Sequence, residues 1–406
     1  MRIGPASDPR WNTLLLALGA MSLQQTFAAL GRNFPYVIAP AILDDLRLDA
    51  AWVGVYVAIA AFGSLLFQLG CGSFIVRYGA LRTSQAALAM VAIGLAAAAG
   101  GPLVLFALSA LIGGGGAAVS TPASSHLLGR YSPPRYLPLI FSIKQTAVPA
   151  GLLLAGVLAP QLTEWLGWRG AVLATAAACL GFAVALQPMR REFDSDRVPS
   201  RSFRFSDFHR TLAAVTATRE LRHLSFACAA FNGLQTVFIA YFVTYLTTLG
   251  YGLAAAGLLF SAATLIAVPG RILWGWLGSV RSTPRQLLGW LALGMAASST
   301  LLGLSGGDWP IAITAIAAVG LSLTALSWHG VLLAEAARLA PEGMRGSATG
   351  GVLSFGQVGA LALPLVYGAV LGLTGSYGMG FVLCGLPAVA VGVTLLRRGK
   401  PPAPSV

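Results

Sequence analysis

The chain has 406 residues, of which 56% are hydrophobic and 10% are charged. Soluble domains carry about 25% charged residues, so the composition excludes a soluble globular protein and predicts a membrane protein with many spanning segments. The formal net charge is +13, a feature that also occurs in proteins that bind nucleic acid. The basic residues flank the apolar segments, however, and this placement is a topology signal. We therefore expect a lipid bilayer and no nucleic acid as partner.

Apolar stretches of about 20 residues, the length that a spanning helix needs, recur along the whole chain. The stretch after Arg10 is too long for the apolar core of a signal peptide, so we expect it to stay as the first helix. The polar segment 189–221 divides the predicted helices into two sets of six. The twelve predicted helices cover residues 12–37, 50–71, 84–100, 102–128, 137–160, 169–188, 222–248, 254–279, 286–305, 309–334, 347–371 and 377–396.

Most of the 26 Lys and Arg residues fall on one side of the membrane under this assignment. That side holds both termini and the segment 189–221, whereas the opposite side has only Arg32, Arg47 and Arg169. Because Lys and Arg are enriched in cytoplasmic loops, we predict that the termini and the central linker lie in the cytoplasm. We expect the chain in the inner membrane of a bacterium.

No residues that would carry catalysis or hold a cofactor stand out in the sequence. The four cysteines lie in or beside apolar segments without metal-ligand spacing, so they predict neither disulfides nor a metal site. The run Gly113–Gly116 lacks the Lys-Ser/Thr pair of a phosphate-binding loop and predicts close helix packing. We expect no enzyme activity and no cofactor.

Lys144 and Arg271 are the two basic residues that this assignment places deep within the apolar segments. A charge inside a bilayer is costly and persists where it faces a cavity or a partner. Both residues lie roughly 15 Å from the cytoplasmic boundary at about 1.5 Å per residue. Two cations at similar depth predict one cavity that holds an anionic substrate. The alternatives for Lys144 are that it extends toward the cytoplasm or loses its proton through desolvation. The alternative for Arg271 is that it bonds backbone carbonyls at an inner gate.

The two halves of the chain share a short pattern at the inner ends of their second helices. Residues 68–82 and residues 271–285 can be aligned so that Gly72 matches Gly275. Each segment has small and basic residues where the second and third helices of a half meet. The pattern predicts a tight, cation-rich inner turn in each half.

The first of these segments resembles the loop motif Gly-x-Leu-Ala-Asp-Arg-x-Gly-Arg of the major facilitator superfamily. The matching residues are Gly72, Arg77, Gly79 and Arg82, whereas Val76 stands at the position of the motif's Asp. The resemblance covers the full chain. It implies an all-α membrane protein with 12 transmembrane helices in two pseudo-symmetric six-helix bundles. The expected domains are residues 1–188 and 222–406, joined by a cytoplasmic linker at 189–221.

A narrower resemblance concerns the segments 142–151, 269–277 and 327–351. They look like bacterial members near the cyanate, nitrate/nitrite and organic-anion porters. Arg271 stands where monocarboxylate and oxalate:formate transporters place a substrate arginine. Nitrate porters pair that arginine with a second one at the position of Gln68. The resemblance therefore favours an organic carboxylate over nitrate.

Further polar residues in the predicted helices are candidate substrate contacts. The alternative for each is a hydrogen bond between helices, worth only about 0.6 kcal/mol. For His329 the alternative is a histidine that is simply hydrogen-bonded. The predicted substrate contacts are Arg271, Lys144, Gln68, Gln25, Asn232, Gln235, His329 and Trp328.

Prolines close to the two cations predict helix kinks that would allow bending at a gate. Pro149 lies five residues from Lys144, and Pro269 lies two from Arg271. Each removes a backbone hydrogen bond from its helix. The predicted gating residues are Arg77, Arg82, Gly72, Gly275, Pro149 and Pro269.

These features predict a monomeric secondary carrier of a small organic anion, a mono- or dicarboxylate, that works by alternating access. The sequence predicts no buried Asp or Glu, and Glu335 is expected to pair with Arg338 or Arg345 at the inner end of its helix. A carboxylate proton relay therefore has no position, which leaves anion exchange, or proton symport through His329 or the substrate. The alternative function is a proton-coupled efflux pump for hydrophobic or cationic compounds, which the lack of buried acids disfavours.

Overall fold

A computed structural model of the chain describes residues 9–133, 137–200, 215, 218–280, 282–306, 309–340 and 345–397. Within these residues every regular element is helical. In a bilayer each backbone N–H and C=O group needs a partner within the protein, and a helix supplies it within one segment. The predicted all-helical membrane fold is confirmed. The twelve predicted spans correspond to the helices given below. Two of these spans, 137–160 and 169–188, are joined through the long helix α7.

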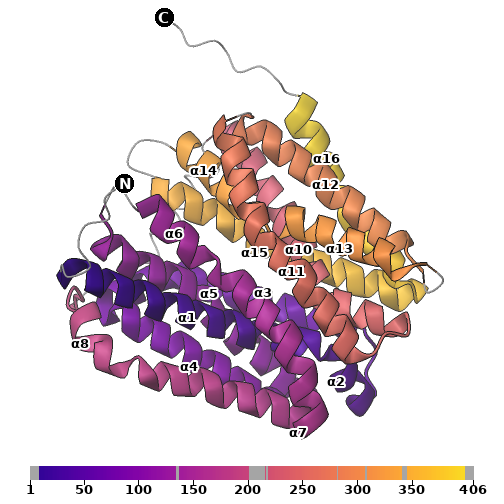
Figure 1. The fold of residues 1–406 in the computed structure, drawn as a ribbon, viewed down its shortest axis with the longest axis horizontal. Helices are drawn as coiled ribbons and strands as arrows, with labels where there is room; N and C mark the ends of the chain where they lie inside the picture. Colours follow the sequence, from indigo (N-terminus) through magenta and orange to yellow (C-terminus); the bar gives the residue numbers. More distant parts are fainter. Residues whose placement is uncertain are drawn as a thin grey trace, which may run out of the picture. The chain divides into compact units, whose positions relative to one another are not determined.

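The helices of the first half are shown from indigo to magenta in Figure 1. Long helices α1, α3, α4, α5 and α7 pack side by side, and the shorter elements connect or flank them. The elements are α1 (Pro9–Val37), α2 (Ala39–Leu46), α3 (Trp52–Tyr78), α4 (Ala80–Ala98), α5 (Leu103–Tyr131), α6 (Leu137–Gln145), α7 (Ala147–Ala185), the 3₁₀ helix η2 (Gln187–Met189) and α8 (Arg190–Phe193).

The helices of the second half begin after the central linker. Thr218 caps the first of them, because its side chain accepts a hydrogen bond from the backbone N–H of Leu221. The elements are α10 (Arg219–Thr248), α11 (Leu253–Val280), α12 (Pro284–Leu304), α13 (Ile311–Ala325), α14 (His329–Leu339), α15 (Arg345–Thr374) and α16 (Tyr377–Arg397).

Helix α7 is too long to cross a membrane only once. Its 39 residues extend about 58 Å at 1.5 Å per residue, roughly twice the hydrocarbon thickness of a bilayer. Gly167 divides the helix, because its backbone adopts φ 67° and ψ 166°, which glycine reaches at little cost. Eleven candidate spans occur among the described residues, and one of them, Ile143–Phe193, contains this division.

The chain packs as two compact units that each include a short segment from the other half of the sequence. The start of α11 belongs to unit 1, where Ser261 donates to the carbonyl of Leu153 on α7 at 2.9 Å. The start of α3 belongs to unit 2. The predicted domain boundaries stay a prediction. Unit 1 comprises Met1–Arg47, Ile59–Phe208 and Leu253–Ser261, and unit 2 comprises Leu48–Ala58, His209–Gly252 and Ala262–Val406.

Two helices that the sequence predicts as continuous are broken. The predicted helix 137–160 divides at Thr146 into α6 and α7, and the predicted helix 309–334 divides into α13 and α14. Pro149 explains the first break, because it has no N–H for the carbonyl of Gln145 and its ring clashes with that carbonyl. The second break contains no proline and is stabilised by side chains of α11, described below.

The inner turn of the first repeat lies at Gly79 and not at Gly72. Helix α3 continues to Tyr78, and Gly79 precedes α4 with φ 99°. Gly72 and Gly275 both lie on exposed positions inside helices, and a side chain at either would meet no atom within 4 Å. Close packing therefore does not require a glycine at these two positions.

Candidate functional site

Lys144 lies at the end of α6, one turn before Pro149, and its side chain is completely buried. The ammonium Nζ donates to the backbone carbonyl of Thr121 at 3.4 Å and to the side-chain oxygen of Gln145 at 3.3 Å. Both acceptors are neutral. None of the ion pairs among the described residues includes Lys144. Among the described residues this buried cation therefore has hydrogen-bond acceptors but no counter-ion.

Two further side chains complete this site in unit 1. Thr121 on α5 donates its hydroxyl to Oε1 of Gln25 on α1 at 3.2 Å, and Gln25 is buried. The structure thus brings together the predicted contacts Lys144 and Gln25, which are linked through Thr121, while Gln145 contacts Lys144. We call these four residues the Lys144 cluster.

Arg271 lies on α11 and bonds the break between α13 and α14. Its Nε donates to the carbonyl of Leu326 at 3.0 Å. Trp274 on the same helix donates to the carbonyl of Leu323. The side-chain hydroxyl of Ser327, within the break, donates to the carbonyl of Ala267 on α11. The alternative foreseen for Arg271, a bond to a backbone carbonyl, is therefore present. It also explains the break, since α11 supplies partners for backbone groups that leave the helical pattern.

Trp328 and His329 follow this break directly. Trp328 is fully buried and donates its indole Nε1–H to Oε1 of Gln235 on α10 at 3.0 Å. The ring of His329 stacks on Trp328 with 3.8 Å between ring centroids. Nδ1 of His329 is buried and has no hydrogen-bond partner in the described structure. Arg271 lies close enough for its charge to act on His329.

Asn232 lies one turn before Gln235 on α10. Its amide Nδ2 donates to the carbonyl of Gly356 on α15 at 2.8 Å. Asn232 and Gln235 are only half-buried, in contrast to most of α10. The structure thus brings five of the predicted contacts together in unit 2. We call Asn232, Gln235, Arg271, Trp328 and His329 the Arg271 cluster.

The remaining predicted site residues lie elsewhere. Gln68 is half-buried on α3, and Pro269 lies within a continuous α11. The guanidinium of Arg77 lies over the ring of Tyr78 at 5.5 Å. Arg82 is exposed on α4. Their gating roles stay a prediction.

A functional residue that the sequence reasoning missed is Asp194, which caps the start of α4. Its carboxylate accepts hydrogen bonds from the backbone N–H groups of Leu81 at 2.8 Å and Arg82 at 3.0 Å, and Arg190 lies 3.7 Å away. Burial raises the pKa of Asp194, and these hydrogen bonds and the Arg190 charge oppose the rise. The one signal in the sequence was the missing acid of the loop motif, at Val76.

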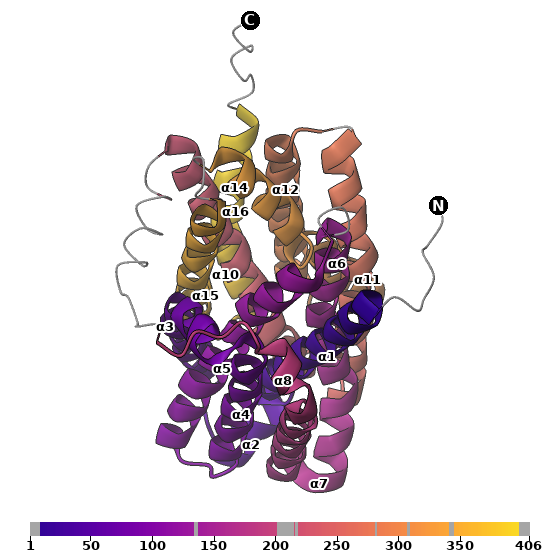
Figure 2. The same ribbon diagram turned by 90° about the vertical axis from the view of Figure 1, so that its left-hand side faces the viewer.

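Asp194 belongs to a segment, residues 190–198, that we call the brace. The brace begins with α8, which packs against α4 (Figure 2). Asp196 of the brace pairs with Arg130 and His126 at the end of α5. The backbone N–H of Val198 donates to the carbonyl of Val76 on α3 at 2.8 Å. The brace therefore ties together the end of α3, the start of α4 and the end of α5 in unit 1.

One carboxylate is buried within the described spans of unit 2, which with the buried Asp194 contradicts the prediction that no acid is buried. Glu335 on α14 is buried and forms two hydrogen bonds of 2.7 Å with Arg338. The predicted pairing with Arg338 is confirmed, and this pairing explains why the acid is tolerated. The side chain of Arg345 lies outside the described residues.

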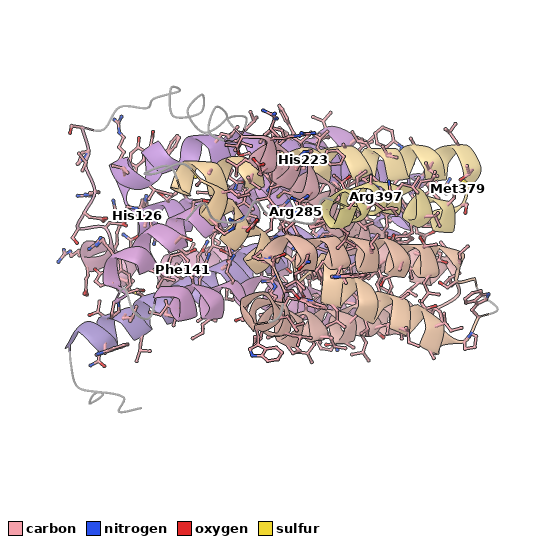
Figure 3. All side chains as sticks on the ribbon, turned by 90° about the horizontal axis from the view of Figure 1, so that it is seen from above. His126, Phe141, His223, Arg285, Met379 and Arg397 are labelled. Atoms are coloured by element: carbon pink, nitrogen blue, oxygen red, sulfur yellow. The ribbon has the colours of Figure 1, made fainter. Side chains whose placement is uncertain are left out.

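Basic side chains gather at one end of unit 2. Figure 3 labels three of them: His223 near the start of α10, Arg285 in the first turn of α12 and Arg397 at the end of α16. Arg285 donates to the carbonyl of Leu395 at 3.2 Å. The orientation of this end toward the cytoplasm stays a prediction.

Comparison with known proteins decides the family. The family model described as Major Facilitator Superfamily matches residues 21–336. The chain belongs to this superfamily. It is therefore a major facilitator transporter and not an enzyme, as predicted, and a multi-pass membrane protein.

Three relatives of this major facilitator chain are bacterial transporters. It is 24% identical to a 4-hydroxybenzoate transporter of Pseudomonas aeruginosa, over 97% of this chain and 94% of the relative. It is 26% identical to a gentisate transporter of Corynebacterium glutamicum (89% and 82%) and 25% identical to a gallate transporter of Pseudomonas putida (89% and 86%).

Solved structures share the fold. A bacterial homologue of the human lysosomal transporter Spinster superposes with a TM-score of 0.74 at 16% identity, covering 98% of this chain and 100% of that one. A D-xylose–proton symporter superposes with a TM-score of 0.68 at 16% identity, covering 95% and 97%. At this identity the likeness shows the fold alone, and it is the two-bundle fold that the sequence motif implied.

Proposed function

We propose that the chain carries small organic carboxylates across the bacterial inner membrane, with aromatic monocarboxylates as the preferred class. The observation that carries this proposal is Lys144, a fully buried ammonium whose described partners are all neutral. A buried charge without a counter-ion is costly. A substrate carboxylate removes that cost by supplying the counter-ion, and it gains a charge-assisted hydrogen bond.

Arg271 is the second cation of the proposal. Its guanidinium has a planar arrangement of donors that suits a carboxylate, and its bond to Leu326 through Nε fixes the plane of that group. Lys144, by contrast, acts as a point charge on a flexible stem. The proposal therefore assigns Arg271 the orienting contact and Lys144 the neutralising contact. The prediction that both line one cavity stays a prediction.

The relatives support the carboxylate class. The three named above are transporters of 4-hydroxybenzoate, gentisate and gallate, all of which are aromatic acids that ionise well below neutral pH. An efflux pump for organic cations finds less support, because Glu335, the buried acid within the described spans, already pairs with Arg338. We propose coupling by proton symport or by exchange against a second anion.

The test is uptake into liposomes that contain the purified protein. The panel comprises labelled benzoate, 4-hydroxybenzoate, oxalate, nitrate and an organic cation. We expect uptake of the aromatic acids by the wild type, and at least a tenfold loss in Lys144→Ala and in Arg271→Ala, since each removes a charge-assisted contact worth about 1.5–3 kcal/mol. Arg191→Ala, at an exposed position of α8, is the control and should transport normally.

Two results would contradict the proposal. Undiminished uptake of carboxylates in both variants would refute the assignment of the cations. Transport of the organic cation without transport of any carboxylate would refute the substrate class. A pH-sensitive dye inside the liposomes separates the two coupling modes, because only symport acidifies the lumen with substrate.

A further inference from the structure

Helix α10 presents an open polar strip on an otherwise enclosed surface. Between residues 227 and 246, every position is buried except Ala229, Asn232, Gln235 and Thr236. These positions recur at the three- and four-residue spacing of one helix face. A lipid-facing strip would be apolar, and this strip carries two amides and a hydroxyl. The strip is therefore partly accessible and is unlike a lipid-facing surface.

The chemistry of its partner fixes the orientation of the Gln235 amide. Trp328 Nε1–H is a donor and has no acceptor capacity, so the Gln235 atom that it contacts at 3.0 Å is the carbonyl Oε1. The Nε2 group of Gln235 then points away from Trp328. No described residue accepts a hydrogen bond from it. Gln235 therefore offers a hydrogen-bond donor on the open strip.

The opposite holds for Asn232. The backbone carbonyl of Gly356 is an acceptor only, so the Asn232 atom that it contacts at 2.8 Å is the amide Nδ2. The Oδ1 atom has no donor among the described residues. Thr236 is not available to it, because its hydroxyl donates to the backbone carbonyl of Asn232 at 2.6 Å. Asn232 therefore offers an acceptor, one turn from the donor of Gln235.

A free acceptor and a free donor at i and i+3 on one helix lie about 5–6 Å apart at their Cβ atoms. A single hydroxyl group fits between them, because it donates one hydrogen bond and accepts another. A methyl group or a bare ring edge leaves both amides without a partner, which is unfavourable in an enclosed site. A carboxylate has no hydrogen for Asn232. The strip is thus matched to a neutral hydroxyl.

We infer that Asn232 and Gln235 select substrates that carry a hydroxyl group in addition to the carboxylate, with a phenolic hydroxyl donating to Asn232 Oδ1 and accepting from Gln235 Nε2. The inference rests on the proposed function, since it adds a specificity contact to a carboxylate carrier. Trp328 is a positioning residue: it holds Gln235 in the orientation that exposes the donor. The break that contains Trp328 is also bonded by Arg271 through Leu326, so the hydroxyl and carboxylate contacts share one structural support.

The experiment compares four substrates in the same liposomes: benzoate, and benzoate with a hydroxyl at ring position 2, 3 or 4. We expect the wild type to prefer one hydroxylated acid over benzoate by about tenfold in Vmax/KM, the effect of one or two neutral hydrogen bonds. Its methoxy analogue, which accepts but cannot donate, should lose the part of the preference that depends on Asn232.

The variants separate selectivity from transport. Asn232→Leu and Gln235→Glu should lower the ratio of Vmax/KM for the preferred hydroxy acid to Vmax/KM for benzoate toward one, because both acids carry the same carboxylate and only one carries the hydroxyl. Gln235→Glu keeps an acceptor for Trp328, so it preserves that hydrogen bond and guards against misfolding. Trp328→Phe should relax the selectivity, because Gln235 is then free to turn. Thr236→Val, on the same strip, is the matched control and should keep the wild-type preference.

The experiment distinguishes a failure of the hydroxyl inference from a failure of the proposed carboxylate transport. If the wild type transports benzoate and all three hydroxy acids equally, the hydroxyl inference is refuted and the carboxylate carrier stands. If Asn232→Leu and Gln235→Glu lower benzoate and hydroxybenzoate uptake in parallel, the two amides have a structural role and the inference is again refuted. If no carboxylate is transported by the wild type, the proposed function itself fails and the inference fails with it.

Discussion

Asp194 occupies the space that a side chain on Gly79 would need. A Cβ atom at Gly79 would lie 2.2 Å from Cγ of Asp194, whose oxygens accept from the backbone N–H groups of Leu81 and Arg82 in the first turn of α4. Gly79 and Asp194 are 115 positions apart in the chain. Their contact joins the inner turn between α3 and α4 to the brace, and a negative charge at this helix start also interacts favourably with the helix dipole.

The first prediction concerns Asp194. We expect Asp194→Ala to lower the free energy of unfolding by about 2 kcal/mol, since a lost helix cap costs about 1 kcal/mol and buried N–H groups without partners cost more. Thermal unfolding in detergent measures it. Glu192→Ala is the control, because Glu192 is an exposed acid of the same brace. Equal melting temperatures for the two variants would show that the cap has no stabilising role.

The second prediction concerns the buried carboxylate of Glu335. Its side chain is 6% exposed, whereas that of Arg338 is 64% exposed. Arg338→Ala leaves the carboxylate buried without its partner, so it should destabilise the protein more than the double variant Glu335→Gln/Arg338→Ala. Because Arg338 is largely in solvent, we expect a difference of about 1 kcal/mol. A double-mutant cycle of melting temperatures measures it.

The single variant Glu335→Gln also tests whether Glu335 takes part in proton coupling, when its transport is measured. The hydrogen bond from Arg338 makes Glu335 a structural partner and raises the pKa of Arg338. Uptake of an aromatic acid by Glu335→Gln should therefore keep its pH dependence. Loss of proton-driven uptake with retained exchange would assign Glu335 to the coupling path instead.

The sequence was sufficient to predict the spans and the class of fold, because length and apolarity alone decide whether a segment crosses a bilayer. It also placed Lys144, which is buried, and Arg271, which is half-buried, within membrane spans. The break after Gln145 could be predicted from the sequence, because Pro149 has no N–H to donate to the carbonyl of Gln145. The break before Trp328 was not, because its backbone groups find their partners on α11, more than 50 residues away.

Contacts between residues far apart in the chain also explain why the role of Asp194 at the start of α4 was not predicted. A capping acid is usually sought within a few residues of its helix, and Asp194 lies more than 110 positions from the N–H groups that it binds. The orientation of the Asn232 and Gln235 amides is likewise set by partners on other helices. Glu335 was misjudged because the sequence cannot show how deeply the inner end of a helix is covered by its neighbours.

The third prediction concerns pH and the contact between α2 and α7. Trp168 Nε1 and Arg169 both donate to Asp45, at 3.0 and 2.8 Å. The hydrogen bond from Trp168, with that from Arg169, lowers the pKa of Asp45 below its usual 3.8, against a smaller effect of burial. Because the folded-state pKa is the lower one, the ionised carboxylate stabilises the fold above 3.8 and loses this effect as the pH falls through the folded-state pKa.

Melting temperatures of the wild type and Asp45→Asn between pH 6 and pH 3 test this sign. We expect a constant difference in favour of the wild type at the upper end and a smaller difference below the usual pKa. A difference that grows on acidification would contradict the assigned direction of the pKa shift.

The last prediction compares two adjacent glycines of α5. A Cβ atom on Gly114 would lie 2.2 Å from the carbonyl oxygen of Ala60 on α3, whereas one on Gly113 would meet no atom within 4 Å. Ser64 also donates to the carbonyl of Gly114 at 3.0 Å, so the two helices are in close contact at this point. Alanine is better than glycine in a helix by about 1 kcal/mol.

Gly113→Ala should therefore keep or raise the melting temperature. Gly114→Ala has the same helix propensity, but it forces α3 and α5 apart, and overpacking of this kind costs about 1–3 kcal/mol. The two variants differ by one position and have the same composition, so their difference reports packing alone. Because α5 also carries Thr121 of the Lys144 cluster, Gly114→Ala should lower aromatic-acid uptake as well. Normal stability together with normal uptake in Gly114→Ala would show that α3 can move away from α5 without consequence.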